Sequence, residues 1–556
     1  MTGMLCFLLL PRDPRKNPWP VLEGWQLPSV DRSDEKSGSR TLLIYLVATA
    51  ILSGALVMVI EVLGSRVIGP FFGVSLFVWT ALITVTLISL AVGYAAGGVL
   101  ADKRQSPDTL YGIILLSGIL VLLIPLLKGP VLKASVELGL RTGAFVSALA
   151  LFGPSLCLLG CVSPFIIRIA AREIRNIGRT VGFFYALSTV GSFGGTLLTG
   201  YVFIAYFSVS RIFTVIGALL IGLAVAYFLF HRGKWIAIAT LALPALLFPG
   251  EAAVSKMQAN GTWVTRVYNK DGFYGNLKVV DYTLGSMHTR ELMIDGLIQG
   301  GIDLKNRLSV YGSPYFLQYL PVSVHPDGKT CLAIGLGAGI VPTWYESRGV
   351  RTDVVDIDPD VVGIARKYFS FSNSGDVFVS DARYFLNTSG KRYDYVILDV
   401  FNGDTTPGHL LSVEALRTVK ERMADRGVLA VNLFGSLRRE TFMTASIVRT
   451  LEAVFRSVDV HPNFVPEEGD GSGNITVIAR DVIGPAPDPK AFDGIPVHPL
   501  ASGGIVRNMA RTFRFPEGTP AIILSDDYNP VDFYDAWLRE RVRRNLLEIT
   551  DWDVMI

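Results

Sequence analysis

Cysteine is scarce in this chain of 556 residues, which contains only Cys6, Cys157, Cys161 and Cys331. Cys157 and Cys161 are four residues apart in an apolar run without a histidine or carboxylate nearby, so we interpret them as helix-packing residues. No zinc spacing and no disulfide framework is visible, and we expect no metal site.

Charge is also scarce. Only 18% of the residues are charged and the formal net charge is +3, so no basic field favours a nucleic acid partner. Hydrophobic residues make up 50%, which is high for an ordinary soluble enzyme of this length. The apolar excess lies in the first half. The composition therefore predicts a membrane part followed by a more polar part.

Long apolar stretches fill the first half, each close to the roughly 20 residues that a helix needs to cross a bilayer. We predict six spans, near 41–62, 76–98, 109–128, 143–166, 183–206 and 211–230. A seventh stretch at 235–248 is shorter and contains Pro244, which is typical of re-entrant or interfacial helices. The predicted division is an N-terminal tail over 1–40, a helical membrane domain over 41–250, a small antiparallel β domain over 251–320 and an α/β domain over 321–556.

Lysine and arginine gather in the tail and in alternate loops, at Lys103 and Arg104, between Arg168 and Arg179, and at Arg232. The positive-inside rule predicts that the tail and these loops are cytoplasmic. Six crossings would put the C-terminal half in the cytoplasm as well, and seven would put it outside. The choice between them depends on the ligand of that half.

The periodicity changes in the second half. "NLKVVDY" and "RELMIDG" predict short strands of the small antiparallel sheet. From residue 330 apolar strands such as "TCLAIGL", "TDVVDID" and "YDYVILDV" alternate with helical segments, which predicts a doubly wound, Rossmann-like α/β sheet. Ligands of such sheets bind at the carboxyl ends of the strands.

A glycine-rich loop, "IGLGAGI", follows the first of these strands and contains Gly335, Gly337 and Gly339. Glycine permits positive φ and lets a ligand approach the backbone. Asp356 ends the next strand and can accept hydrogen bonds from both ribose hydroxyls, while Asp381 ends the third and is placed for an adenine amino group. The loop lacks the third glycine of the dinucleotide fingerprint and a P-loop lysine, which argues against NAD. An adenosine-containing ligand is therefore expected.

Five motifs in order resemble the spermidine synthases, or polyamine aminopropyltransferases, joined here to a membrane domain. They are "MIDGLIQ", "IGLGAGI", "VVDIDPDVV", "SDARYFL" and "YDYVILDVFN", within about residues 261 to 485. The resemblance implies a class I methyltransferase-like fold and a substrate that is S-adenosylmethionine or its decarboxylated form. It also implies release of methylthioadenosine, no further cofactor, and a homodimer.

The same resemblance implies roles for individual residues. Asp399 matches the catalytic carboxylate, which serves as base and counter-charge near the amine and the sulfonium. The expected contacts to the adenosyl group are Gln299, Gly335, Gly337, Gly339, Asp356, Asp381 and Ala382. The expected contacts to the rest of the substrate are Tyr274, Asp295, Tyr311 and Asn402.

Four positions depart from the family pattern. Ala338 stands where the family has the aspartate that holds the ammonium end of the propylamine chain, and Asn402 replaces a second aspartate. Gly275 replaces a glutamine, and residues 311–313 read Tyr-Gly-Ser instead of Tyr-His-Glu or Tyr-Gln-Glu. A polyamine carries several positive charges, so the loss of carboxylates leaves the acceptor open.

Several reactions stay open. Without an aspartate at position 338, nothing there repels the carboxylate of intact S-adenosylmethionine. An external amine can attack, as in the family, or the substrate's own carboxylate can attack and give homoserine lactone and methylthioadenosine. Methyl transfer is a third route, and a nucleotide-gated transporter is the non-enzymatic alternative. Substitute amine-binding carboxylates, and a lid histidine, are available on later loops at Asp526, Asp527, Glu467, Glu468 and His409.

The sulfonium substrate is made and kept in the cytosol. We therefore expect six crossings, a multi-pass protein of the inner membrane surrounded by lipid, and a cytoplasmic catalytic domain.

Overall fold

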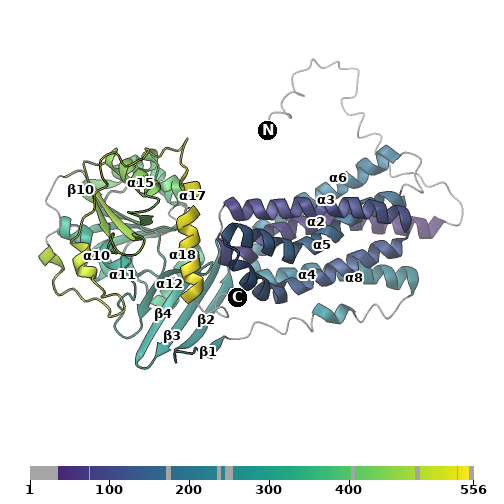
Figure 1. The fold of residues 1–556 in the computed structure, drawn as a ribbon, viewed down its shortest axis with the longest axis horizontal. Helices are drawn as coiled ribbons and strands as arrows, with labels where there is room; N and C mark the ends of the chain where they lie inside the picture. Colours follow the sequence, from purple (N-terminus) through teal and green to yellow (C-terminus); the bar gives the residue numbers. More distant parts are fainter. Residues whose placement is uncertain are drawn as a thin grey trace, which may run out of the picture.

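The computed structural model describes residues 36–73, 76–170, 177–233, 240–244, 254–401, 407–482, 489–534 and 536–549. A bundle of long helices is followed by an α/β part at one end of the bundle (Figure 1). Most of the predicted tail, most of the predicted seventh element and Asn402 lie outside the described residues.

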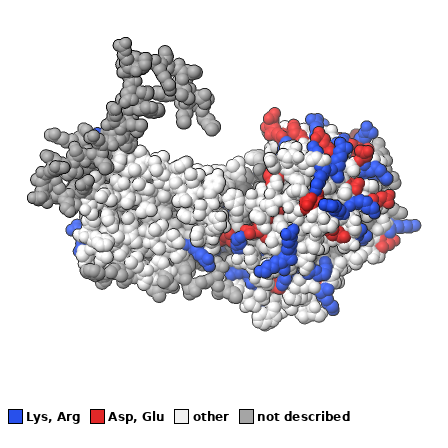
Figure 2. All heavy atoms as spheres, turned by 180° about the vertical axis from the view of Figure 1, so that it is seen from behind, with Lys and Arg blue, Asp and Glu red and all other residues white. Residues whose placement is uncertain are grey.

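Six helical stretches of the described chain are long and apolar enough to cross a membrane. They are α2 (Lys36–Phe72), α3 (Leu76–Lys103), α4 (Pro107–Val136), α5 (Leu140–Ala170), α6 (Ile177–Leu198) continued by η2 (Thr199–Phe203) and α7 (Ile204–Tyr206), and α8 (Val209–Arg232). Figure 2 shows that charged side chains gather on the α/β part and are few on the bundle. The bundle is thus compatible with a membrane location, and its first helix extends ten residues beyond the predicted end at 62.

Small residues let α3 and α5 pack closely. A Cβ atom on Gly93 would lie 2.2 Å from the carbonyl oxygen of Cys157, and one on Gly97 would lie 2.6 Å from the Cα of Cys161. The thiol of Cys161 donates to the Cys157 carbonyl at 3.4 Å. The two cysteines therefore belong to a close helix contact, as predicted.

The two ends of the bundle have different neighbours. At one end Tyr45 near the start of α2 packs on Tyr111 in α4 and on His231 near the end of α8, with ring centroids 6.0 and 5.2 Å apart. At the other end the backbone N–H of Val209, which begins α8, donates to Asp271 of the α/β part at 2.7 Å. The chain therefore enters the bundle and leaves it at one end, and the α/β part lies at the opposite end (Figure 1).

This arrangement corrects one expectation. If the bundle spans a bilayer, the start of α2, together with the loops after α3 and α5, lies on one face and the α/β part on the other. The tail and the catalytic domain cannot then both be cytoplasmic. Six helices do return the chain to its starting face, but residues 234–253 join α8 to a domain at the far end. The predicted seventh element lies in this connection, of which only 240–244 are described.

The small sheet is present as an antiparallel meander. Its strands, in spatial order, are β1 (Ser255–Met257), β2 (Trp263–Asp271), β3 (Asn276–Leu284), β4 (Met287–Ile294) and β5 (Leu297–Asp303). The sheet ends earlier than the predicted boundary at 320, because a helix, α10 (Ser313–Val324), begins with Pro314 in its first turn. Proline suits that position since the N–H it lacks would have no helical partner.

The large sheet has the predicted Rossmann-like, class I methyltransferase-like form. Its strands, in chain order, are β6 (Thr330–Ile334), β7 (Arg351–Asp356), β8 (Val377–Val379), β9 (Tyr393–Leu398), β10 (Met423–Ser436), β11 (Ser457–Pro462) and β12 (Ser472–Arg480). The spatial order is β11-β12-β10-β9-β6-β7-β8, and β12 alone is antiparallel to its neighbours. The order reverses between β6 and β9, which opens a crevice at their carboxyl ends.

Helices connect these strands and cover the sheet. They are α11 (Ile340–Ser347), α12 (Pro359–Phe369), α13 (Ala382–Thr388), α14 (Val413–Glu421) and α15 (Phe442–Glu452), followed by the short η5 (Pro489–Phe492) and α16 (Ile505–Met509). The chain then runs through α17 (Val531–Tyr534) into α18 (Ala536–Ile549), which returns to the bundle (Figure 1).

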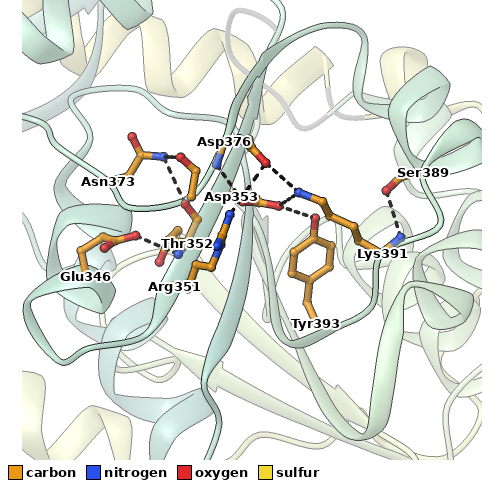
Figure 3. A network of polar contacts seen from close by, with 10 residues as sticks. Glu346, Arg351, Thr352, Asp353, Asn373, Asp376, Ser389, Lys391 and Tyr393 are labelled. Carbon is orange, nitrogen blue, oxygen red and sulfur yellow. Dashed lines mark hydrogen bonds and ion pairs between the residues drawn. The ribbon is translucent and has the colours of Figure 1, made fainter.

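A polar network joins β7 to the start of β9 (Figure 3). Buried Asp353 accepts hydrogen bonds from Lys391 Nζ at 2.7 Å, from the Tyr393 hydroxyl at 2.8 Å and from the backbone N–H of Asp376 at 2.8 Å. Burial raises the pKa of Asp353, but these hydrogen bonds outweigh it and the pKa is lowered. The network thus joins β7 and β9 near the ends of the strands that are opposite the glycine loop.

We predict that cysteines placed at the two ends of the bundle label from opposite sides of the membrane. Arg104→Cys and Asp425→Cys, each in a background whose native cysteines are serine, are treated with an impermeant maleimide in intact and in opened cells. One of the two is expected to label in intact cells. Labelling of both, or of both only after opening, would contradict the arrangement of the domains.

We predict that Lys391→Met lowers the free energy of unfolding by about 1–3 kcal/mol at pH 7, because the carboxylate of Asp353 loses a charged partner. Because the pKa of Asp353 is lower in the folded protein than in the unfolded chain, its carboxylate stabilises the fold at a pH above the ordinary pKa of aspartate. This contribution is lost as the pH falls through the pKa that Asp353 has in the folded protein. The difference from wild type should therefore shrink toward pH 3 in urea unfolding experiments. Arg392→Met is the control, because the guanidinium of Arg392 is 4.0 Å from the carboxylate of Asp425, which is fully exposed, and such a pair contributes little to stability.

Candidate active site

The glycine loop is shaped by its neighbours. Gly335, Gly337 and Gly339 have φ values of +89°, +50° and +74°, which favour glycine. A Cβ atom on Gly335 would lie 2.2 Å from the carbonyl oxygen of Asp399, and one on Gly337 would lie 2.8 Å from that of Gln299. The loop therefore brings β5, β6 and β9 into contact, and two of the predicted site residues lie against it.

Asp399 follows β9 at the strand-order reversal. Its backbone N–H donates to the carbonyl of Ile334 in β6 at 2.9 Å. Its half-buried carboxylate accepts a hydrogen bond at 2.8 Å from the side-chain amide of Asn432, a buried residue on β10. Burial raises the pKa of Asp399, and the hydrogen bond from Asn432 opposes this effect. The carboxylate is thus a stronger base than an exposed aspartate.

Asp356 braces the glycine loop from the end of β7. One carboxylate oxygen accepts from the N–H of Leu336 at 2.8 Å, and the other accepts from the N–H of Asp358 at 2.9 Å. Each carboxylate oxygen has two lone pairs, so both can accept a further hydrogen bond from a ribose hydroxyl. The ribose contact expected of Asp356 stays a prediction.

Asp358 lies two residues after Asp356, and the sequence reasoning did not single it out. It caps α12 by accepting from the N–H of Asp360 at 2.9 Å, and its other oxygen is buried with no hydrogen-bond partner among the described residues. Burial, Asp360 and Asp356 raise its pKa to about 6. The available signal was a second aspartate two residues after Asp356 in "DIDPD", which looks like an ordinary helix cap.

Tyr274 lies at an acidic rim of the crevice. Its ring is 42% exposed. Burial raises the pKa of Tyr274, and three nearby carboxylates raise it further. They are Asp358, Asp381 and Asp356, in order of their effect. Negative charge therefore gathers around the predicted substrate-lining tyrosine.

A β-bulge positions Gln299. Leu292 of β4 pairs with Gly300, whereas the next residue of β4, Met293, pairs with Ile298, so Gln299 is the extra residue of β5. Bulges of this kind redirect a side chain and are frequent beside active sites. The predicted ribose contact therefore lies next to the glycine loop because of a local irregularity in the small sheet.

Ala338 occupies an apolar environment. It is buried, and a Cβ atom on Gly300 would lie 3.1 Å from the Ala338 methyl group. Leu336, two residues before Ala338, and Ile340, two residues after it, pack in the same hydrophobic cluster as Ala338. The position where the family has an aspartate is thus apolar here.

Tyr311 pairs with Glu291, another residue that the sequence reasoning missed. The Tyr311 hydroxyl donates to the buried carboxyl of Glu291, close to Gly301 of β5. Burial raises the pKa of Glu291 to about 7, against the effect of hydrogen bonds from Tyr311 and Tyr282. The substrate contact expected of Tyr311 stays a prediction.

Asp295 shapes the turn between β4 and β5. It is buried with a φ of +46°, and its carboxylate accepts from the N–H of Asn276 at 2.8 Å. A Cβ atom on Gly275 would lie 2.9 Å from the other carboxylate oxygen, so this turn disfavours the glutamine of the family at position 275. These contacts give Asp295 a structural role, and its predicted substrate contact stays a prediction.

Asp381 lies at the start of α13, where its carboxylate accepts from the N–H of Tyr384 at 2.9 Å. It is exposed, and its other oxygen is 3.9 Å from Nε2 of His409. Ala382 is the first residue of the helix. The segment around His409 therefore borders the predicted adenine contact, as a lid would.

Two of the proposed substitute carboxylates have partners. Asp526 accepts from Arg383 at 2.7 Å, and Arg383 also donates to the carbonyl of His409 at 2.7 Å. Glu467 pairs with Arg511 at 3.3 Å. Asp526 therefore helps to join α13 to the segment around His409, and its carboxylate is not available to an amine.

The predicted site residues thus fall into three groups. Those at the crevice are Gln299, Gly335, Gly337, Gly339, Asp356 and Asp399, with Tyr274, Asp381 and Ala382 at the rim. Asp295 and Tyr311 have partners in the small sheet, and Asn402 lies outside the described residues. Within the described part of the chain, no three histidine, cysteine, aspartate or glutamate side chains are grouped as metal ligands would be.

Comparison with known proteins agrees with the motifs. Residues 316–482 match the model of the spermine/spermidine synthase domain. This part of the chain is spermidine synthase-like. A polyamine aminopropyltransferase of Vibrio vulnificus is 34% identical over 167 residues, which are 28% of this chain and 51% of the relative. An N-terminal histidine N-methyltransferase of Emericella nidulans is 35% identical over 133 residues, which are 23% of this chain and 24% of the relative.

Among solved structures, a probable spermidine synthase from Corynebacterium glutamicum matches with a TM-score of 0.38 and 18% identity, covering 46% of this chain and 95% of that chain. The chain spans about half of the length of the Vibrio vulnificus relative and about a quarter of the length of the Emericella nidulans relative. The matched family model covers only the spermidine synthase-like domain, and the helical bundle lies outside it.

We predict that Arg383→Gln and Asp526→Asn each speed hydrogen exchange at the amides of Leu410 and Leu411 by about twofold to fivefold, as expected for a partly exposed ion pair. The double variant should exchange no faster than Arg383→Gln alone, because this variant already removes the pair with Asp526 as well as the contact to the His409 carbonyl. Additive effects would show that the pair does not hold the lid. Asn529→Leu is the positive control, since Asn529 donates to the carbonyl of Gly408 at 2.6 Å.

Proposed function

We propose that the spermidine synthase-like domain binds S-adenosylmethionine or its decarboxylated form and releases methylthioadenosine by transfer of an aminopropyl-type group to an amine. The observation that carries this proposal is the contact of the glycine loop with Asp399, Gln299 and Asp356. A cationic sulfonium suits this crevice, because the carboxylate of Asp356 contacts the glycine loop and Asp399 lies beside it.

The proposed chemistry is a displacement at the carbon next to the sulfonium. The amine gives a proton to Asp399, and the lone pair of the amine nitrogen forms the new C–N bond. The electrons of the breaking C–S bond neutralise the sulfur. Burial makes Asp399 more basic, which favours the proton transfer. Methylthioadenosine then leaves as a neutral thioether, and Gln299 and Asp356 orient its ribose.

A lyase is the second candidate, and the apolar surroundings of Ala338 favour it. An intact S-adenosylmethionine can place its carboxylate there without meeting an aspartate. Attack of that carboxylate on its own γ-carbon would give homoserine lactone and methylthioadenosine without a general base. Methyl transfer is favoured by the sequence similarity to methyltransferases such as the histidine N-methyltransferase. A polyamine as acceptor, a homodimer and bound lipid stay predictions.

We place the catalytic domain on the cytoplasmic face, where the sulfonium is made. The tail and the loop at Arg104 then lie on the other face, against the positive-inside count. The end of the bundle next to the domain also carries basic side chains, which can contact anionic headgroups of a cytoplasmic leaflet. Its lysines and arginines are Arg66, Lys128, Lys133, Arg141 and Arg211. In the maleimide experiment Arg104→Cys should be the variant that labels in intact cells.

The direct test is chromatography of the products from purified full-length protein. Decarboxylated S-adenosylmethionine with putrescine or spermidine should give methylthioadenosine, and omission of the amine should prevent it. Methylthioadenosine from intact S-adenosylmethionine alone would establish the lyase instead. A methylated acceptor with S-adenosylhomocysteine would establish methyl transfer.

We predict that Asp399→Asn lowers kcat/KM by about 10²–10⁴-fold, the usual contribution of a general base. Asp425→Asn, a fully exposed aspartate, should leave it unchanged. Asn432→Leu removes a hydrogen bond that lowers the pKa of Asp399, so the acidic limb of the pH–rate profile should move to higher pH. Full activity in Asp399→Asn would contradict the aminopropyl transfer, and would be expected of the lyase.

A further inference from the structure

A buried line of polar side chains runs from the active site across the large sheet. Asn432 of β10 is directly opposite Thr476 of β12, and Thr476 is directly opposite His461 of β11. Residues opposite each other in antiparallel strands point to the same face of a sheet, so the three side chains share one face. Each of them is at most 3% exposed. At its first member this polar line contacts Asp399, because the Asn432 amide donates to the carboxylate.

Two members of the polar line have atoms that need partners. Oγ1 of Thr476 and Nε2 of His461 are buried without a hydrogen-bond partner among the described residues. Such atoms are rare in native proteins, because leaving them unpaired costs free energy. Cβ atoms of opposite residues are about 4.5–5.5 Å apart, so the Thr476 hydroxyl is within one hydrogen bond, or one bridging water, of Asn432 and of His461. The hydroxyl can therefore connect the two.

His461 offers an acceptor at the far end of the polar line. Its Nδ1 is 2.9 Å from the carbonyl oxygen of Met509 in α16. A carbonyl oxygen only accepts, so Nδ1 carries the hydrogen and Nε2 of the neutral ring is an acceptor. Burial lowers the pKa of His461, which favours the neutral ring. The charged side chains that act on it, Asp459 of β11 and Arg480 of β12, pair with each other at 3.3 Å.

The polar line can run in either direction. When Asp399 is ionised, the Asn432 N–H donates to it, as in the structure, and the Thr476 hydroxyl can donate to the amide oxygen. When Asp399 is protonated, the carboxyl instead donates to the amide oxygen. A half-turn of the amide then directs its N–H to Thr476, and the hydroxyl donates to Nε2 of His461. Within this line His461 thus has a donor only while Asp399 holds a proton.

We propose that His461 is a positioning residue: it accepts the last hydrogen bond of the polar line while Asp399 holds a proton. This bond stabilises the protonated carboxyl and makes Asp399 a stronger base. The proton stays on Asp399, and the hydrogens of Asn432 and Thr476 only change the atoms toward which they point. The line itself does not depend on the reaction, whereas its use in accepting a proton from the amine rests on the proposed function.

The test is infrared difference spectroscopy of the full-length protein from about pH 4 to about pH 9. The C=O stretching band of the protonated Asp399 carboxyl is the one that Asp399→Asn removes, and its titration midpoint gives the pKa. His461→Phe keeps an aromatic ring but not the acceptor, and should lower this midpoint by about 0.5–1 pH unit, the equivalent of one hydrogen bond. His461→Gln, whose amide oxygen can accept in place of Nε2, should keep the midpoint close to that of the wild type.

Two comparisons separate this effect from a loss of structure. His325→Phe is the matched control, since His325 is also buried, with Nδ1 lacking a partner among the described residues, but packs on Tyr395 of β9. It should leave the midpoint unchanged. Asn432→Leu interrupts the polar line, so adding His461→Phe to it should cause no further change. A merely structural effect of His461→Phe would persist in this background.

A midpoint that stays or rises in His461→Phe would overturn the proposal, and His461→Leu repeats the test with a smaller side chain if phenylalanine does not fit. The acidic limb of the pH dependence of kcat/KM should move to lower pH by the same amount. If the infrared midpoint falls but no methylthioadenosine forms from either donor, the proposed function fails and the proposal stands.

Discussion

The parallel pairing of β6 with β9 is the interaction on which the site depends. Ile334 pairs with Leu398, so the residues that follow them, Gly335 and Asp399, emerge side by side although more than 60 positions separate them in the sequence. The absence of a side chain on Gly335 makes room for the Asp399 carbonyl. The connections leave β6 and β9 in opposite directions, and in doubly wound sheets such a point is where ligands bind.

The helical bundle is tied to the same site through a buried arginine. Arg543 of α18 is fully buried and donates to the carbonyl of Pro70 in α2 and to that of Asp295 in the β4–β5 turn, both at 2.8 Å. Leaving such a group without hydrogen bonds would cost several kcal/mol, so the contacts fix the turn relative to the bundle. Gln299 follows this turn by four residues. A shift of α2 would therefore be transmitted to the glycine loop.

Local patterns were sufficient to predict the elements that carry Gly335, Asp356 and Asp399, because buried parallel strands are nearly continuous apolar runs with polar residues at their ends. They were insufficient for Gln299, whose position depends on a bulge in strand pairing, and for Glu291, whose partner Tyr311 lies in the loop between β5 and α10. Hydropathy likewise predicted six long apolar helices, as many as the described residues contain. It contains no information about which end of the bundle a later domain packs against.

The distribution of carboxylates indicates what kind of acceptor the site suits. The positions that hold a polyamine in the family have become Ala338 and Asn402, and Asp526 is engaged by Arg383. The carboxylates that remain surround Tyr274 and the glycine loop, where the adenosyl sulfonium would bind. Each buried cation needs its own compensating charge, so the proposed transfer to a polyamine would require carboxylates other than position 338 and Asp526 to hold the acceptor.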